Sequence, residues 1–122
     1  MRVADTSALY ALFSKNDIHH KKAIDAFKKP EPILIPLEIW SETLSLIQYR
    51  QDYKTARSAG EYLLKLPHVD LEIPTRQMVM DTWKQFNNAH GKLSYPDAAV
   101  VACCLNKNLT PISFDKKINK YV

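Results

Sequence analysis

Residues 3–9, VADTSAL, place an acidic residue at the junction between two apolar segments. The short segment RVA predicts a buried strand, and the apolar run 8–13 that follows predicts a helix. Asp5 lies between them and is followed at once by two hydroxyl residues. Asp, Thr and Ser are all favoured at helix N-caps, whereas a carboxylate at the tip of a buried strand is also suited to binding a metal ion. Both interpretations of Asp5 stay open at this point.

Composition bounds the class of protein. The 122 residues, 46% hydrophobic and 25% charged, are typical of one globular domain over residues 1–122. No apolar run approaches the roughly 18 residues of a membrane span, and the N-terminal stretch lacks the pattern of a signal peptide. Cys103 and Cys104 are adjacent in an apolar stretch, which favours a core helix in a reducing compartment. We therefore expect a cytoplasmic protein with no membrane partner.

The excess of 17 Lys and Arg over 13 Asp and Glu is compatible with a polyanionic partner but does not require one. Lys116, Lys117 and Lys120 follow Asp115, where they either contact phosphates or form a solvated helix end. The four histidines stand in polar contexts and are expected on the surface, rather than as the paired acid and base of a metal-free ribonuclease.

Short apolar segments alternate with amphipathic ones along the chain, and no hairpin signal separates them. This alternation predicts parallel strands joined by helical crossovers. The expected fold is a three-layer α/β/α sandwich with a short parallel sheet of about four strands. The remaining strands are expected at 33–35, 69–73 and 110–113. Helices are expected from a cap at Asn16 or Asp17 to about residue 27, from residue 36 to a polar break at 50–52, and from that break to about residue 66. Two more are expected from a cap at Thr75 to the stretch 87–91 and over 94–108, with a terminal turn or helix in 114–122.

In the helix after residue 36, Leu37, Trp40, Leu44 and Ile47 recur at spacings of three and four, which predicts a packed face. Glu42 lies nearly opposite this stripe, where an ordinary exposed glutamate is also expected.

Three further acidic residues have positions that suit a helix cap, a solvated charge or a metal ligand. Asp97 opens an apolar helix and fits a capping box with Ser94. Asp115 follows the last predicted strand and is placed to cap a terminal helix. Glu42 has a rival one turn away, Glu38. Because ligands of open parallel sheets gather beyond the carboxyl ends of the strands, Asp5 and Asp115 are expected at the same edge.

Four segments, in order, resemble the motifs of the PIN domain, in particular of the VapC-type toxin ribonucleases, over essentially the whole chain. In that family the first acid opens a D-T/S-S motif and the second is a glutamate in the helix after strand two. The third opens an alanine-rich helix, and the fourth lies in a T-x-D motif. The matching segments are VADTSAL (3–9), ILIPLEIWSETLSLI (33–47), LSYPDAAVVA (93–102) and PISFD (111–115), with Asp5, Glu42, Asp97 and Asp115 as the acids.

Two positions depart from the family pattern. Ser113 stands where threonine is usual, and it keeps the hydroxyl. Pro96 precedes Asp97, where the family often has a small residue, and proline is tolerated in a first helical turn. The register from Ile35 favours Glu42 over Glu38.

The chemistry expected of these acids follows from their charge. Two carboxylates about 5 Å apart repel by about 3 kcal/mol at an effective dielectric of about 20, so a cluster of four needs cations or protons. Oxygen ligands select hard cations, here Mg²⁺ or Mn²⁺, which activate water for attack on a phosphodiester. Asp5 and Asp97 are the first candidates for ligands, completed by Glu42 and Asp115, with Ser7 and Ser113 orienting a carboxylate or a bound water.

The resemblance implies an endoribonuclease acting on RNA, the toxin of a toxin–antitoxin pair. It also implies a homodimer and an antitoxin whose tail occupies the acidic groove. The alternative is a PIN-like module that binds nucleic acid or protein without cutting. A phosphatase or phosphoaspartate receiver is disfavoured, because neither a D-x-D repeat nor an early acidic pair is present.

Overall fold

The computed structural model of the protein describes residues 1–122 as four short strands in one sheet and seven helices. All strand pairs are parallel, in the order β3-β2-β1-β4. The elements are β1 (Arg2–Ala4), α1 (Thr6–Phe13), α2 (His20–Lys28), β2 (Ile33–Pro36), α3 (Leu37–Arg50), α4 (Tyr53–Lys65), β3 (Val69–Glu72), α5 (Arg76–Asn88), α6 (Tyr95–Lys107), β4 (Thr110–Ile112) and α7 (Lys116–Asn119).

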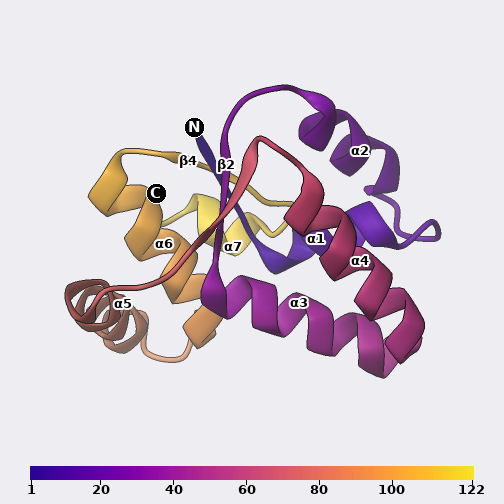
Figure 1. The fold of residues 1–122 in the computed structure, drawn as a ribbon. Coiled ribbons are helices and arrows are strands. Elements are labelled where there is room, and N and C mark those ends of the chain that lie inside the picture. The colour runs from indigo at the N-terminus through magenta and orange to yellow at the C-terminus, as the bar shows by residue number, and fades with distance from the viewer.

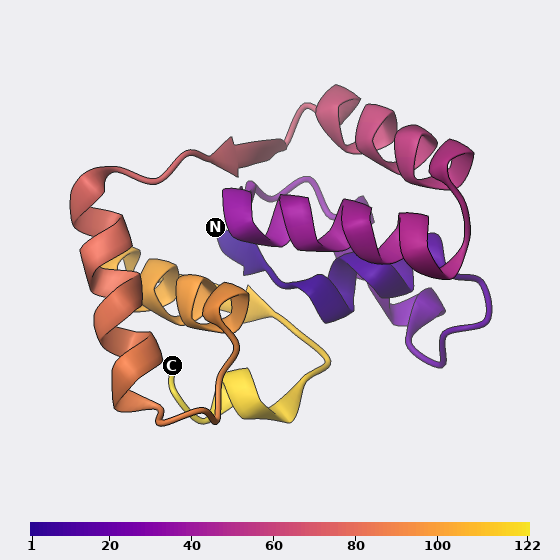
Figure 2. The same cartoon turned by 90° about the horizontal axis from the view of Figure 1, so that it is seen from below.

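The three-layer α/β/α prediction is confirmed. Figure 1 shows the strands crossing the middle of the molecule, with α3 beginning directly where β2 ends. Seen from below, α5 and α6 lie on one side of the strands, and α1, α2 and α4 lie on the other (Figure 2). With both faces covered, the inner strands read as continuous apolar runs, and all four residues of β2 are buried. No helix is both long and apolar enough to cross a bilayer.

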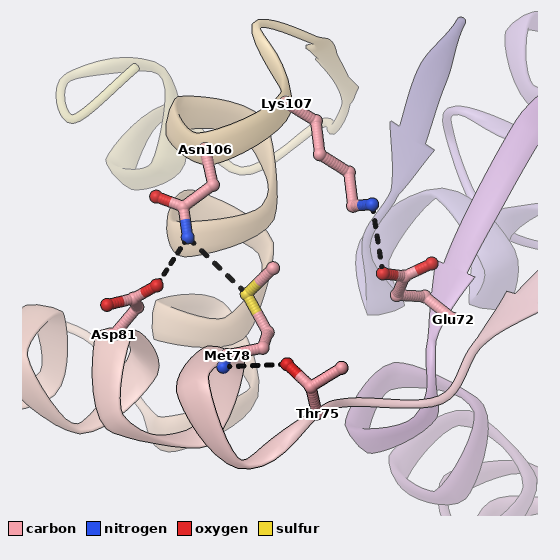
Figure 3. Close-up of polar contacts among 6 residues, drawn as sticks. All are labelled: Glu72, Thr75, Met78, Asp81, Asn106 and Lys107. Carbon is pink, nitrogen blue, oxygen red and sulfur yellow. Dashed lines mark hydrogen bonds and ion pairs between the residues drawn. The ribbon is translucent and has the colours of Figure 1, made fainter.

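Polar contacts fasten α5 to α6 and α6 to the sheet (Figure 3). The Asn106 side-chain amide on α6 donates to the Asp81 carboxylate on α5 at 2.6 Å. Thr75 caps α5 by accepting from the main-chain N–H of Met78 at 3.2 Å, as its position predicted. Lys107, at the end of α6, forms an ion pair of 3.2 Å with Glu72 of β3. These contacts fix the orientation of α6, the helix that carries Asp97.

The predicted packed face of α3 is wrong in part. Its buried residues are Ile39, Thr43 and Ile47, whereas Leu37 is exposed. The apolar stripe did not identify the buried face, because α3 packs on two sides. Its Trp40 side contacts α4, whereas its Ile39 side lies toward the sheet, α1 and α6. Glu42 therefore flanks the buried face instead of lying opposite it.

Two local expectations also need correction. The second helix begins at His20 with no side-chain cap, because the Asp17 carboxylate accepts from the main-chain N–H of His19 in the preceding turn, at 2.8 Å. The histidines are not all on the surface: His20 and His68 are half-buried, and each makes a hydrogen bond with a main-chain carbonyl. These two histidines fasten loops and helices.

Candidate metal-binding acidic site

Asp5 is the centre of the candidate site. It follows β1, and its main-chain N–H donates to the Ile112 carbonyl of β4 at 3.2 Å. The residue is only 1% exposed. Its Oδ1 accepts from the main-chain N–H of Ala8 at 2.9 Å and from the Ser7 hydroxyl at 2.7 Å, and thereby caps α1. The helix uses one carboxylate oxygen and leaves Oδ2 to other partners.

Ser113 joins Asp5 to the end of β4. Its hydroxyl donates to Asp5 Oδ2 and accepts from the main-chain N–H of Asp115 at 2.9 Å. The Ser7 hydroxyl in turn accepts from the main-chain N–H of Phe114 at 2.9 Å. Both serines proposed from the sequence thus donate to the same carboxylate, and they tie the β1 and β4 ends together.

Burial dominates the electrostatics of Asp5. Removal from water raises the pKa of its carboxyl above the ordinary value, although the hydrogen bonds from Ser113, Ala8 and Ser7 oppose the rise. The charge of Asp97 raises the pKa further. Asp5 and Asp97 therefore lie in one electrostatic environment, although 92 positions separate them in the sequence.

Asp97 lies in the first turn of α6 and takes part in the predicted capping box. Its main-chain N–H donates to the Ser94 hydroxyl at 3.2 Å, and its Oδ2 accepts from the main-chain N–H of Ser94 at 3.4 Å. The residue is half-buried. The helix thus fixes the position of Asp97 at the same edge as Asp5.

Glu42 reaches this edge through Thr6. The Thr6 hydroxyl donates to Glu42 Oε1, which links α3 to the residue next to Asp5. Glu38 instead lies near Tyr95, where burial and then the charge of Glu38 raise the pKa of the tyrosine. Hydrogen bonding to the Asp5 segment distinguishes Glu42 from its rival.

Asp115 is tied to the group through its main chain. Its N–H donates to Ser113, whereas its Oδ1 accepts from the main-chain N–H of Lys117 at 2.9 Å and caps α7. The four acids therefore lie around the carboxyl edge of the sheet, and the Thr6 and Ser113 hydroxyls link the Asp5 segment to Glu42 and to Asp115. We call this region, Asp5, Glu42, Asp97 and Asp115, the acidic edge.

The donors of the acidic edge fit a hard divalent cation by their chemistry. All are carboxylate or hydroxyl oxygens, and none of the four acids takes part in the protein's three ion pairs. An unpaired carboxylate as deeply buried as Asp5 favours a cation nearby. No three His, Cys, Asp or Glu side chains converge closely enough to hold one ion, so the structure brings Asp5 and Asp97 together electrostatically without forming a closed ligand shell.

A family model of the PIN domain matches residues 2–122. The chain belongs to the PIN domain family. Among solved structures, VapC20 of Mycobacterium tuberculosis, a toxin that cleaves the sarcin–ricin loop, is similar with a TM-score of 0.86 at 23% identity; the match covers 100% of this chain and 97% of VapC20. VapBC2 from Rickettsia felis, bound to a DNA fragment from its promoter, is similar with a TM-score of 0.73 at 10% identity, over 98% of this chain and 92% of that chain. No curated protein sequence matches significantly.

Two contacts in this PIN domain were not predicted from the sequence. One is the Thr6–Glu42 hydrogen bond, for which the only local sign is the hydroxyl residue directly after Asp5. The other is the His19 ring, which stacks on Phe114 with centroids 4.4 Å apart and planes inclined by 7°. Phe114 lies between Ser113 and Asp115, so the stacked pair borders the acidic edge.

Proposed function

We propose that this PIN domain is a metal-dependent endoribonuclease that hydrolyses phosphodiester bonds of RNA. The observation that carries the proposal is Asp5, a buried carboxylate with no basic partner that directly follows an inner strand. Keeping such a charge out of water costs free energy unless a cation or proton compensates it. PIN family membership and the similarity to VapC20, which cleaves the sarcin–ricin loop, support the same activity.

We assign Asp5 and Asp97 as ligands of Mg²⁺ or Mn²⁺, directly or through water, with Glu42 and Asp115 completing the set. The ion would neutralise phosphate charge and make water more acidic. Ser7 and Ser113 fix the rotation of the Asp5 carboxylate, and Thr6 does the same for Glu42.

The test is cleavage of structured RNA, including a sarcin–ricin stem-loop, by the purified protein with Mg²⁺, with Mn²⁺ and with excess EDTA. We expect cleavage with at least one metal and none with EDTA. Cleavage that survives chelation contradicts the metal mechanism, and RNA binding without cleavage in either metal favours a non-cleaving PIN module. Asp5→Asn and Asp97→Asn are expected to abolish cleavage, while Asp25→Asn, at an exposed position of α2, serves as the matched control.

The proposal extends to a cytoplasmic toxin that acts as a homodimer and is inhibited by an antitoxin. Similarity to VapBC2, which is bound to a DNA fragment from its promoter, supports this extension. Expression in a bacterial host is expected to arrest growth with the native sequence and not with Asp5→Asn. A small DNA-binding protein encoded in the neighbouring reading frame is expected to restore growth and to co-purify. Light scattering after gel filtration measures the dimer, and RNA cleavage without growth arrest would contradict the toxin role.

A further inference from the structure

A basic pocket lies between the turn that joins α5 to α6 and the C-terminal helix α7. It encloses about 330 Å³ and is lined by Gly91, Lys92, Lys117, Lys120 and Tyr121. This volume is within the range of ligand-binding pockets and leaves room for about ten water molecules. We propose that this pocket binds a phosphate group of the RNA strand beside the bond that is cut, an assignment that rests on the proposed ribonuclease function.

The three lysines of the basic pocket carry charge that the protein does not neutralise. None of them takes part in the ion pairs, whose basic members are Arg2, Arg57 and Lys107. No acidic residue lines the pocket. Ammonium groups that face one cavity repel one another. An anion that enters the cavity attracts all of them and so offsets this repulsion. A phosphate supplies that anion.

The pocket is preformed because buried residues anchor both of its walls. Leu93, next to Lys92, is 2% exposed, and Ile118, next to Lys117, is fully buried in the same core cluster. Tyr121 packs against this cluster. Gly91 has a φ of +84°, which favours glycine, and a Cβ added there would meet nothing within 4 Å. The open side of the pocket at Gly91 gives a ligand access to lysines whose main chain is anchored by these buried neighbours.

The pocket is continuous with the acidic edge through α7. The Asp115 carboxylate accepts from the main-chain N–H of Lys117, a residue of the pocket wall. Lys120 lies five residues after Asp115, roughly 7 Å along a helix axis. The acids by themselves repel an RNA backbone, so attraction has to come from a neighbouring surface. An RNA strand that passes Asp115 places an adjacent phosphate over the lysines.

The experiment measures RNA binding in EDTA, where cleavage is absent, by fluorescence anisotropy of a short labelled RNA at several salt concentrations. The pocket variant carries Lys92→Gln, Lys117→Gln and Lys120→Gln. The matched control removes the same charge from exposed positions on α4, which Figure 2 shows across the molecule from α7, with Lys54→Gln, Arg57→Gln and Lys65→Gln. Thermal unfolding verifies that both variants are folded.

We expect the pocket variant to lose about tenfold or more in affinity and to lower the slope of log K against log salt by about 0.7 for each lost phosphate contact. The control variant is expected to keep most of the affinity. Equal losses in the two variants, no loss in the pocket variant, or no RNA binding by the native protein would each overturn the proposal. A native protein that binds RNA through the pocket but cuts no RNA in either metal would refute the proposed function and leave the pocket assignment standing.

Discussion

Replacing Asp5 by asparagine is expected to stabilise the metal-free protein while abolishing its activity. Burial raises the pKa of this carboxyl, so the ionised form lowers the free energy of unfolding at pH values above the folded-state pKa. Each unit of that rise corresponds to about 1.4 kcal/mol at neutral pH. The cost decreases as the pH falls through the folded-state pKa and is gone below the ordinary value of 3.8. The substitution removes the charge at every pH.

The hydrogen bonds around Asp5 allow this exchange. The amide oxygen of the new side chain replaces Oδ1 and accepts from Ala8 and Ser7. The amide nitrogen replaces Oδ2 and donates to Ser113, whose hydroxyl turns to the Asp115 carbonyl at 3.2 Å. Every native donor keeps an acceptor, and only the second amide hydrogen of the new side chain lacks a protein partner. Asp5→Ala, in contrast, leaves the Ala8 N–H and the Ser7 hydroxyl without an acceptor, at about 1–3 kcal/mol for each buried group.

The assay is thermal unfolding in EDTA across a range of pH. At pH 7, Asp5→Asn is expected to raise the melting temperature by about 4 °C for each kcal/mol gained, and Asp5→Ala to lower it. The gain from Asp5→Asn is expected to shrink as the pH falls. Mn²⁺ is expected to raise the melting temperature of the native protein and not of Asp5→Asn. A lower melting temperature for Asp5→Asn at pH 7, or a gain that does not change with pH, would refute the reasoning.

Three further predictions concern other parts of the molecule. Glu42→Gln is expected to lower RNA cleavage and Glu38→Gln to leave it unchanged, and the reverse result would show that the wrong glutamate was assigned to the acidic edge. Gly60→Ala is expected to raise the free energy of unfolding by up to about 1 kcal/mol, measured by chemical denaturation, because alanine favours a helix more than glycine does. The added Cβ would lie 3.4 Å from its nearest neighbour on α3, an ordinary contact. A lower free energy of unfolding would mean that α3 and α4 cannot accept the methyl group. Burial raises the pKa of Cys103 to about 11 and that of Cys104 to about 12. Thiol reagents at pH 8 are therefore expected to label the two cysteines only after unfolding. Rapid labelling of the folded protein would contradict this prediction.

The sheet was predictable from the sequence because its inner strands are buried on both faces. The run 33–35 contains only apolar residues, and helices that cover both faces are what permit such a run. The buried face of α3 was not predictable in the same way. Periodicity identifies an apolar stripe but not the partner that covers it, and on α3 the Trp40 side meets α4 while the Ile39 side meets the sheet layer.

The acids of the site were found from the sequence through their positions next to strand ends and helix starts, together with the family resemblance. The contacts between them were not, because they join distant residues. Thr6 and Glu42 are 36 positions apart, and Ser113 and Asp5 are 108 apart. His19 and Phe114 come from separate segments that only the finished fold places together. No local pattern encodes such pairs, since each depends on the register of the sheet.

The two interpretations of Asp5, helix cap and metal ligand, are compatible because a carboxylate has two oxygens. Oδ1 caps α1, whereas Oδ2 is bound only by the Ser113 hydroxyl, which has a second acceptor within reach in the Asp115 carbonyl. Asp97 likewise belongs to the first turn of α6. The partial positive charge of a helix N-terminus stabilises a nearby carboxylate by about 0.3–1 kcal/mol, so α1 and α6 offset part of the repulsion between the two acids. In this fold, an aspartate that caps a helix and an aspartate that binds a metal therefore have the same sequence pattern. Only the environment of the second carboxylate oxygen distinguishes the two roles.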